Sequence, residues 1–98
     1  MYMEFTWDDD KNQQNIAKHG LSFEDASKIF DGFTLDLLDD RFEYGELREI
    51  SIGLIDGLAV VTVAHTDRAG LCRIISARPA IKSERKRYEQ AIRKTFDA

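Results

Sequence analysis

The first third of the chain has the end signals and apolar spacing of two short helices. Asp8 can cap a helix N-terminus, and Gly20 can end a helix, so a helix is predicted from Asp8 to about His19. Ser22 provides a second cap, and the apolar residues that follow it recur at helical spacing. A second, shorter helix is therefore predicted to end at about Phe30.

Apolar and polar residues alternate over most of the remaining chain before Pro79, and this alternation predicts β-strands. The predicted strands, including one before the first helix, span residues 2–7, 34–38, 50–54, 58–66 and 71–78. Asp56-Gly57 stands between two of them and favours a two-residue hairpin turn, because both central residues of a type I′ turn need positive φ. The last three strands are therefore expected to form an antiparallel meander.

The last segment is predicted to be a helix that begins at a Ser83 cap, after Pro79 ends the final strand. Its apolar positions fall on one stripe: Tyr88, Ala91, Ile92, Thr95 and Phe96. The order β-α-α-β-β-β-β-α indicates an α+β fold, in which helices pack on one face of a mostly antiparallel sheet. No repeat or linker interrupts the 98 residues, so we expect one domain over residues 1–98.

Charge is divided unevenly along the chain, which a net charge of −4 hides. The stretch 1–67 holds five Lys or Arg and fifteen Asp or Glu, whereas 68–98 holds nine and three. A basic segment suits a polyanion, and the acidic segment is expected to face a basic partner or solvent. The net charge taken alone would have excluded nucleic acid as a binding partner.

Several classes of site and location are excluded by what the sequence lacks. It has one cysteine, Cys72, so no internal disulfide or cysteine-based zinc site is expected. There is no glycine-rich phosphate loop and no hydrolase or metalloprotease motif. No apolar stretch approaches the roughly 20 residues that span a bilayer, and no export signal begins the chain. We expect a cytoplasmic protein without a metal, a cofactor or a membrane segment.

The first predicted helix carries one group of candidate residues. Lys11, Asn15 and Lys18 share a face, with His19 at its C-terminal edge. The helix is polar on almost every side, so it faces either solvent or a ligand. The helix dipole favours protonated His19, which makes it either a capping charge or a proton donor. The other histidine, His65, alternates with two valines and is interpreted as a half-buried, hydrogen-bonded side chain.

The basic C-terminal third carries the second group. Arg68 lies at a predicted tight turn, as either a solvated residue or a binding one. In a regular strand Arg73 and Arg78 point to opposite faces, and Arg78 shares its face with Ile74 and Ser76. A partly buried arginine needs a partner, so Arg78 either pairs with a carboxylate such as that of Glu84 or awaits an anion.

Residues along nearly the whole chain resemble the BrnT toxins of bacterial type II toxin–antitoxin systems. The matching positions, in order, are Trp7-Asp8, Lys11, Asn15, Lys18-His19-Gly20, Ser22 to Ala26, Phe30, Asp39-Asp40-Arg41, Tyr44-Gly45-Glu46, Arg48, Gly53, His65-Thr66, Arg68, Arg73 to Arg78, Ala80, Glu84-Arg85 and Tyr88. Pro79 stands where many relatives have a basic residue, so one phosphate contact is absent.

The resemblance implies a RelE-like fold and a metal-independent endoribonuclease that inhibits translation. It also implies a BrnA-like ribbon-helix-helix antitoxin that neutralises the toxin, forms a heterotetramer with it and is its only link to operator DNA. RNA would lie against the sheet, with Arg68 and Arg78 near the scissile phosphate. The acid or base would come from His19, Lys18, Glu84 or Tyr88, with His19 ranked first because its ordinary pKa lies nearest neutrality. The remaining RNA-binding candidates are Lys11, Arg73, Lys82, Arg85 and Lys86.

Two other functions are compatible with the same residues. One is a regulator that binds nucleic acid without cleaving it, through the same basic surface. The other is an interaction module whose acidic segment docks a basic partner. The acidic residues concerned are Asp36, Asp39, Asp40, Glu43, Glu46 and Glu49.

Overall fold

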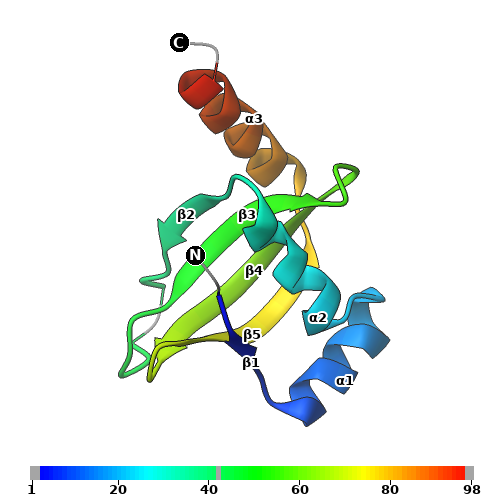
Figure 1. The fold of residues 1–98 in the computed structure, drawn as a ribbon, viewed down its shortest axis with the longest axis vertical. Coiled ribbons are helices and arrows are strands. Elements are labelled where there is room, and N and C mark those ends of the chain that lie inside the picture. The colour runs from blue at the N-terminus through cyan, green and yellow to red at the C-terminus, as the bar shows by residue number, and fades with distance from the viewer. Residues whose placement is uncertain (1–2, 42, 97–98) are drawn as a thin grey trace.

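The computed structural model describes residues 3–41 and 43–96, and its fold is the predicted α+β class. Five strands form one sheet in the order β1-β5-β4-β3-β2. Their bounds are β1 Phe5–Thr6, β2 Leu35–Leu38, β3 Glu49–Ile55, β4 Ala59–Arg68 and β5 Leu71–Pro79. The helices are α1 Asp9–His19, α2 Phe23–Ala26, the 3-10 helix η1 Ser27–Asp31 and α3 Lys82–Phe96 (Figure 1).

Strands β2 to β5 pair antiparallel, as the alternating pattern predicted. Asp56 and Gly57 both have positive φ, which confirms the expected turn between β3 and β4. The predicted first strand is shorter than expected and consists of Phe5–Thr6, which pair parallel with Cys72 and Arg73 of β5. Tyr2 of that prediction lies outside the described residues.

Local signals account for the first two helices. The Asp8 side chain accepts the Lys11 N–H at 3.0 Å, and Gly20 ends α1 in the left-handed region. The Ser22 hydroxyl accepts the Asp25 N–H at the start of α2. The second predicted helix is split, because only its first turn is α-helical and the rest is the 3-10 helix η1.

The hydrophobic core lies between α2, η1 and one face of the sheet, which we call the inner face. Phe23, Ala26 and Ile29 from the helices pack on the sheet, and each is at most 1% exposed. The sheet residues beneath them are Val61, Val63, Ile74 and Ala77. A Cβ on Gly53 of β3 would lie 2.8 Å from Ile29 Cβ, so glycine is required for this close approach. We call the opposite side of the sheet the outer face.

Helix α1 covers the edge of β5 with a polar residue. The buried Asn15 side chain accepts the Ala77 N–H of the strand and donates to Leu21 O. Asn12 accepts the Phe23 N–H and joins α1 to α2. The polar helix therefore needs little apolar surface, because amides attach it, and Lys11 and Lys18 of the predicted face lie in solvent.

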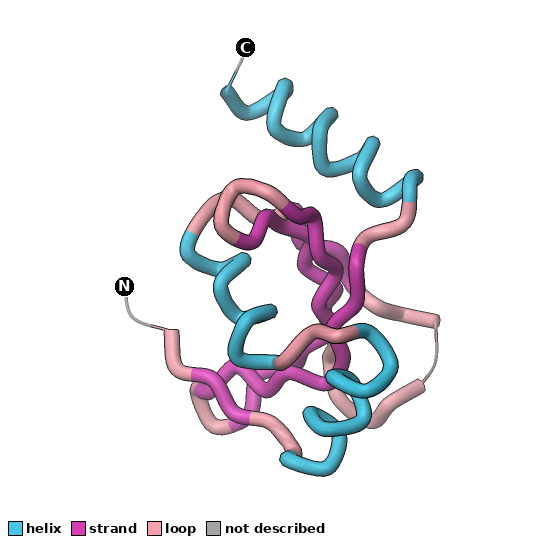
Figure 2. The backbone as a smooth tube through the Cα atoms, turned by 90° about the vertical axis from the view of Figure 1, so that its right-hand side faces the viewer, coloured by secondary structure: helices cyan, strands magenta, loops and turns pink. Residues whose placement is uncertain are grey.

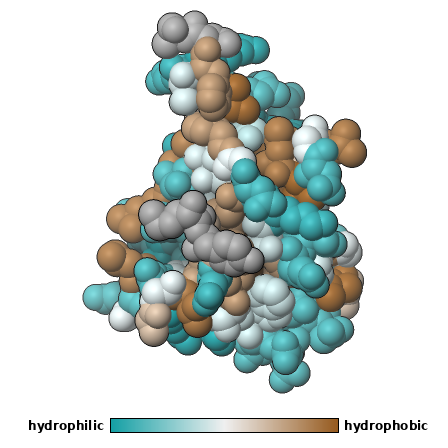
Figure 3. All heavy atoms as spheres, in the orientation of Figure 1, coloured by the Kyte–Doolittle hydropathy of each residue, from teal (hydrophilic) through white to brown (hydrophobic). Residues whose placement is uncertain are grey.

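Helix α3 lies at one end of the sheet and projects beyond it (Figure 1). Figure 2 shows the loop between β2 and β3 on the opposite side of the strands from α2. The predicted cap is wrong, because α3 begins at Lys82 and Ser83 lies inside the helix. The carboxylate of Glu84 accepts the N–H of Ile81, the residue before the helix. Tyr88 is 3% exposed and Ala91 and Ile92 are half-buried, whereas Phe96 is 64% exposed although its ring contacts Phe33. The apolar stripe is therefore least covered at its end. Brown side chains along α3 in Figure 3 show this apolar surface.

Candidate RNA-binding face

A β-bulge in β5 gives the outer face its arginines. Ser76 pairs with Ala64 but Ile74 pairs with His65, so Ile75 is an extra residue in the ladder. Directly paired residues point to the same side of a sheet. Arg78, opposite Thr62, and Arg73, opposite Thr66, therefore share the outer face.

The expectation that these two arginines point to opposite faces is thus wrong, because the extra residue reverses the alternation. Ile74, which was expected to share a face with Arg78, instead belongs to the buried core on the inner face. Ser76 remains on the outer face with Arg78.

Arg78 is fixed by Glu84 at the start of α3. Its Nη1 and Nη2 atoms donate to the two carboxylate oxygens of Glu84 at 2.7 and 2.9 Å. Glu84 also accepts from the Thr62 hydroxyl and the Ile81 N–H. Burial alone would raise the pKa of Glu84, but these hydrogen bonds and the charge of Arg78 outweigh it and lower the pKa. Of the two alternatives for Arg78, the structure shows the carboxylate pair.

A second fixed arginine, Arg41, lies in the loop between β2 and β3. Its Nε and Nη2 atoms donate to Asp39 at 2.9 and 3.1 Å, and Tyr44 also donates to this carboxylate. The hydrogen bonds from Arg41 hold the pKa of Asp39 below its usual value, against the effect of burial. Sequence reasoning placed Asp39 in an acidic segment and did not select Arg41, because a loop without periodicity gives no side-chain direction.

Arg68 is not brought together with Arg78. Arg78 lies opposite residue 62 of β4, and Arg68 is at the end of the same strand. The two positions are six residues apart along β4, or about 20 Å at ~3.4 Å per residue. Arg68 donates to Glu46 at 3.2 Å, and Glu46 also accepts from Arg48. The two arginines can contact different phosphates of one strand but cannot share one.

The other candidates for proton transfer lie apart from Arg78 or are engaged elsewhere. Lys18 is exposed on α1, and His19 lines a shallow pocket with Val61 and Pro79, on the inner side of the sheet. Tyr88 donates its hydroxyl to Phe33 O, and burial raises its pKa. Glu84 is therefore the candidate that contacts Arg78.

The remaining basic candidates come from β5, α1 and α3. Arg73 is half-buried on β5, and its charge acts on Asp8, next to exposed Lys11. The three candidates of α3, Lys82, Arg85 and Lys86, are exposed, and Arg85 donates to Ala80 O at 2.8 Å.

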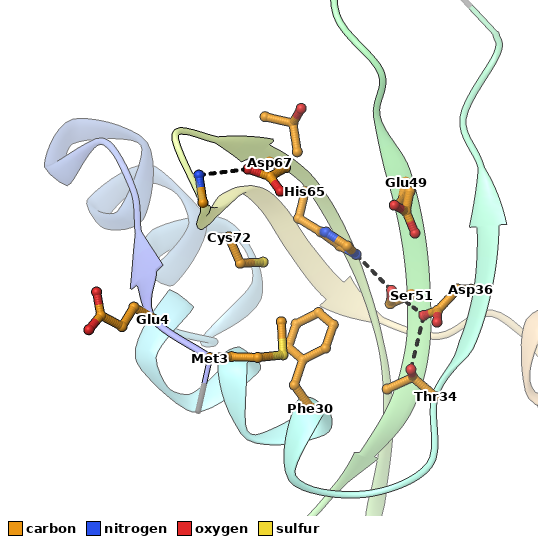
Figure 4. Close-up of a pocket in the computed structure, with 12 residues that line it drawn as sticks. Met3, Glu4, Phe30, Thr34, Asp36, Glu49, Ser51, His65, Asp67 and Cys72 are labelled. Carbon is orange, nitrogen blue, oxygen red and sulfur yellow. Dashed lines mark hydrogen bonds between the residues drawn. The ribbon is translucent and has the colours of Figure 1, made fainter. Parts of the chain in front are cut away.

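The inner face holds a different constellation, in a pocket of about 420 Å³ (Figure 4). His65 Nε2 lies 2.7 Å from Ser51 Oγ, and Ser51 donates to Asp36 at 2.6 Å. Because the Ser51 proton goes to Asp36, His65 Nε2 must donate. The interpretation of His65 as a half-buried, hydrogen-bonded side chain is confirmed. Four acidic residues also line this pocket and make it a poor site for phosphate: Glu4, Asp36, Glu49 and Asp67.

Other features of the described residues limit the chemistry. Burial raises the pKa of the Cys72 thiol to about 11, so it is not a reactive thiolate at neutral pH. Within residues 3–41 and 43–96, no group of three or more His, Cys, Asp or Glu side chains is placed to hold a metal ion. No helix in this part of the chain is long and apolar enough to cross a bilayer.

Comparisons with known proteins show the family of this chain. Residues 7–84 match the family model described as the ribonuclease toxin BrnT of type II toxin–antitoxin systems. The crystal structure of the Brucella abortus ribonuclease toxin BrnT matches with a TM-score of 0.61 and 28% identity, covering 83% of this chain and 100% of that one. No curated protein matches the chain. Because the family model spans most of the sequence, the chain belongs to the BrnT family of ribonuclease toxins.

Proposed function

We propose that this BrnT-family protein is a metal-independent endoribonuclease that holds RNA across the outer face and inhibits translation. The observation that carries the proposal is the β-bulge at Ile75, because it places Arg73 and Arg78 on one face. The other basic side chains proposed to bind phosphates are Lys82, Arg85 and Lys86 of α3 and Lys11 of α1. Together these side chains form a phosphate-binding surface on a protein whose net charge is −4.

The proposed reaction uses the RNA's own 2′-hydroxyl as the nucleophile. Its oxygen attacks the adjacent phosphorus, the bond to the 5′-oxygen of the next nucleotide breaks, and a 2′,3′-cyclic phosphate and a 5′-hydroxyl result. Negative charge builds on the pentacoordinate phosphorus, where arginine donors stabilise it. One well-placed donor is worth roughly 3–4 kcal/mol in such a transition state.

Within this mechanism, Arg78 is the proposed catalytic residue and Glu84 its positioning residue. The two Arg78–Glu84 hydrogen bonds fix the guanidinium plane, and Glu84 is itself held by Thr62 and the Ile81 N–H. Glu84 already accepts several hydrogen bonds and its pKa is lowered, so it is a weak base. On a solvent-exposed face, water can carry the protons.

The test is incubation of the purified protein with RNA in EDTA. The wild type should cleave and leave 2′,3′-cyclic phosphate ends, and Arg78→Ala should lower the rate about 10²–10³-fold, as expected for loss of one donor. Arg73→Ala should weaken RNA binding more than it slows the cleavage step. Lys28→Ala, which removes an exposed charge from η1, is the matched control.

Two results would contradict the proposal. One is no cleavage by the wild type in EDTA, and the other is undiminished cleavage by the double variant Arg73→Ala and Arg78→Ala. Salt-dependent RNA binding without new RNA ends would instead support the non-catalytic regulator.

We further propose that a BrnA-like ribbon-helix-helix antitoxin neutralises the protein in a heterotetramer, and that operator DNA is bound only through it. Membership in a type II toxin–antitoxin family supports an antitoxin partner. The acidic segment supports such docking less than its composition suggested, because Asp39 and Glu46 are already paired with arginines of this chain.

A further inference from the structure

The Asp39–Arg41 pair differs from an ordinary surface ion pair in how unevenly it is buried. The Asp39 side chain is 2% exposed, whereas the Arg41 side chain is 63% exposed. Both carboxylate oxygens accept from Arg41, and one also accepts from Tyr44. A buried carboxylate thus holds an exposed guanidinium in one orientation.

The surrounding loop fixes this pair on the outer face. The Asp39 N–H donates to Arg48 O at 2.8 Å and extends the ladder of β2 and β3. Asp39 therefore continues the row of Leu37 and Ile50, which lies on the outer face with Thr62 and Arg78. Arg48 stacks on the Tyr44 ring, with its guanidinium carbon 3.9 Å from the ring centre.

Arg41 and Arg78 lie near enough for their charges to oppose each other. Hydrogen bonding to Glu84 raises the pKa of Arg78, whereas the positive charge of Arg41 acts to lower it. Each arginine is held by its own carboxylate, and the two anchors come from opposite sides of the outer face. A phosphate bound beside either guanidinium group would reduce this repulsion.

Both guanidinium groups retain donors for such an anion. A guanidinium has five N–H donors, and Arg41 uses one on Nε and one on Nη2 for Asp39. Its Nη1 donors and one Nη2 donor remain. Arg78 binds Glu84 through Nη1 and Nη2 and retains its Nε donor.

We propose that Arg41 is a further phosphate-binding residue of the outer face, in addition to Arg78, and that Asp39 is its positioning residue. The assignment is a refinement of the proposed function and rests on it. A guanidinium fixed in advance suits a phosphodiester, because its planar donors can bind two phosphate oxygens at once. Lysine in place of Arg41 would keep the charge but lose the two hydrogen bonds to Asp39.

The experiment measures binding of a fluorescein-labelled, 2′-O-methyl RNA oligonucleotide, which cannot be cleaved through its 2′-oxygen, over a range of salt concentrations. Arg41→Ala should weaken binding about tenfold or more, as expected for a lost hydrogen bond to a charged group. The slope of log affinity against log salt should decrease by about 0.7, the value for one phosphate of a single strand. Arg41→Lys should keep the slope and bind with intermediate affinity.

Two controls separate binding from folding. Lys28→Ala removes one charge outside the proposed site and should keep the wild-type affinity and slope. The double variant Asp39→Ala and Arg41→Ala removes the buried carboxylate together with its partner, so no buried charge is left alone. Its thermal unfolding midpoint shows whether it is folded, and it should bind as weakly as Arg41→Ala.

The outcomes distinguish this site from the function on which it rests. If the wild type fails to bind RNA, the proposed function fails with it. If the wild type binds, Arg78→Ala weakens binding and the folded double variant binds like Lys28→Ala, the function stands and the assignment of Arg41 is overturned.

Discussion

His65 shows how a half-buried polar side chain is fixed by its neighbours. Its ring packs edge-on against Phe30, with ring centres 5.1 Å apart, and Nε2 donates to Ser51. Burial lowers the pKa of His65, although the carboxylates of Glu49 and Asp36 act in the opposite direction. The neutral ring is therefore the form that suits the folded protein.

The lowered pKa of His65 makes stability depend on pH below neutrality. Above pH 6.5 the histidine is neutral in both the folded and unfolded states, so its contribution is constant. As pH falls below 6.5 the unfolded chain binds a proton more readily, and folded stability is lost until the folded pKa is passed. The thermal unfolding midpoint should therefore fall between pH 7 and pH 5.

His65→Gln should reduce this fall, because it removes the buried imidazole. Asp39 and Glu84 do not contribute to the change between pH 7 and pH 5. Their lowered pKa values affect stability only as pH falls through more acidic values. An equal fall in the wild type and His65→Gln would contradict the assignment.

At the scale of elements, the sequence predicts what local signals determine. The caps of α1 and α2, the Asp56-Gly57 turn and the antiparallel strands are all confirmed. The β-bulge at Ile75 could not be predicted, because an extra residue in a ladder depends on the partner strand and the apolar run of β5 continues through it. The faces of Arg73 and Ile74 were therefore misassigned.

The candidate site was predictable to the same extent. The basic residues of β5 and α3 stand out in the composition, and Glu84 was a named partner for Arg78. Arg41 was missed because its direction depends on Asp39 and Tyr44, which are fixed by tertiary contacts. Local patterns locate elements, whereas side chains in an irregular loop are placed by their partners.

Packing between η1 and β3 should be the element contact most sensitive to a single added methyl group. In Gly53→Ala the new Cβ would meet Ile29 Cβ at 2.8 Å and Thr34 Cγ2 at 3.2 Å. Overpacking of this kind costs about 1–3 kcal/mol. At roughly 4–8 °C per kcal/mol for a chain of this size, the thermal unfolding midpoint should fall by about 4–24 °C.

Gly32→Ala is the control, because a Cβ there meets nothing within 4 Å and the backbone φ is −131°. Its midpoint should be unchanged or slightly higher. A Gly53→Ala midpoint equal to that of Gly32→Ala would show that the contact can relax.

For the whole molecule, charge is arranged by face more than by segment. The acidic segment contributes Arg41 and Arg48 to the outer face, while four of its acids line the inner pocket: Glu4, Asp36, Glu49 and Asp67. Arg73 and Arg78 of the basic segment lie on the outer side of β5. RNA and a basic protein partner would therefore favour opposite faces.

The proposed toxin activity should appear at the level of the cell. Induced expression should arrest growth, and co-expression of the product of the adjacent reading frame should relieve the arrest. The double variant Arg73→Ala and Arg78→Ala, produced at the same level, should not arrest growth. Growth arrest by this variant would show that toxicity does not depend on these outer-face arginines. If the product of the adjacent reading frame neither binds the protein nor relieves the arrest, it is not the antitoxin.

The attachment of α1 by Asn15 affects how the protein resists aggregation. Sheets grow by adding strands to free edges, but the amide of Asn15 already occupies the Ala77 N–H, and β1 occupies the start of the same edge. At the other edge, pairing of two copies through β2 would bring the exposed Asp36 and Asp40 of each copy together. Edge-to-edge stacking of copies is therefore opposed on both sides, by a covered backbone on one and by like charge on the other.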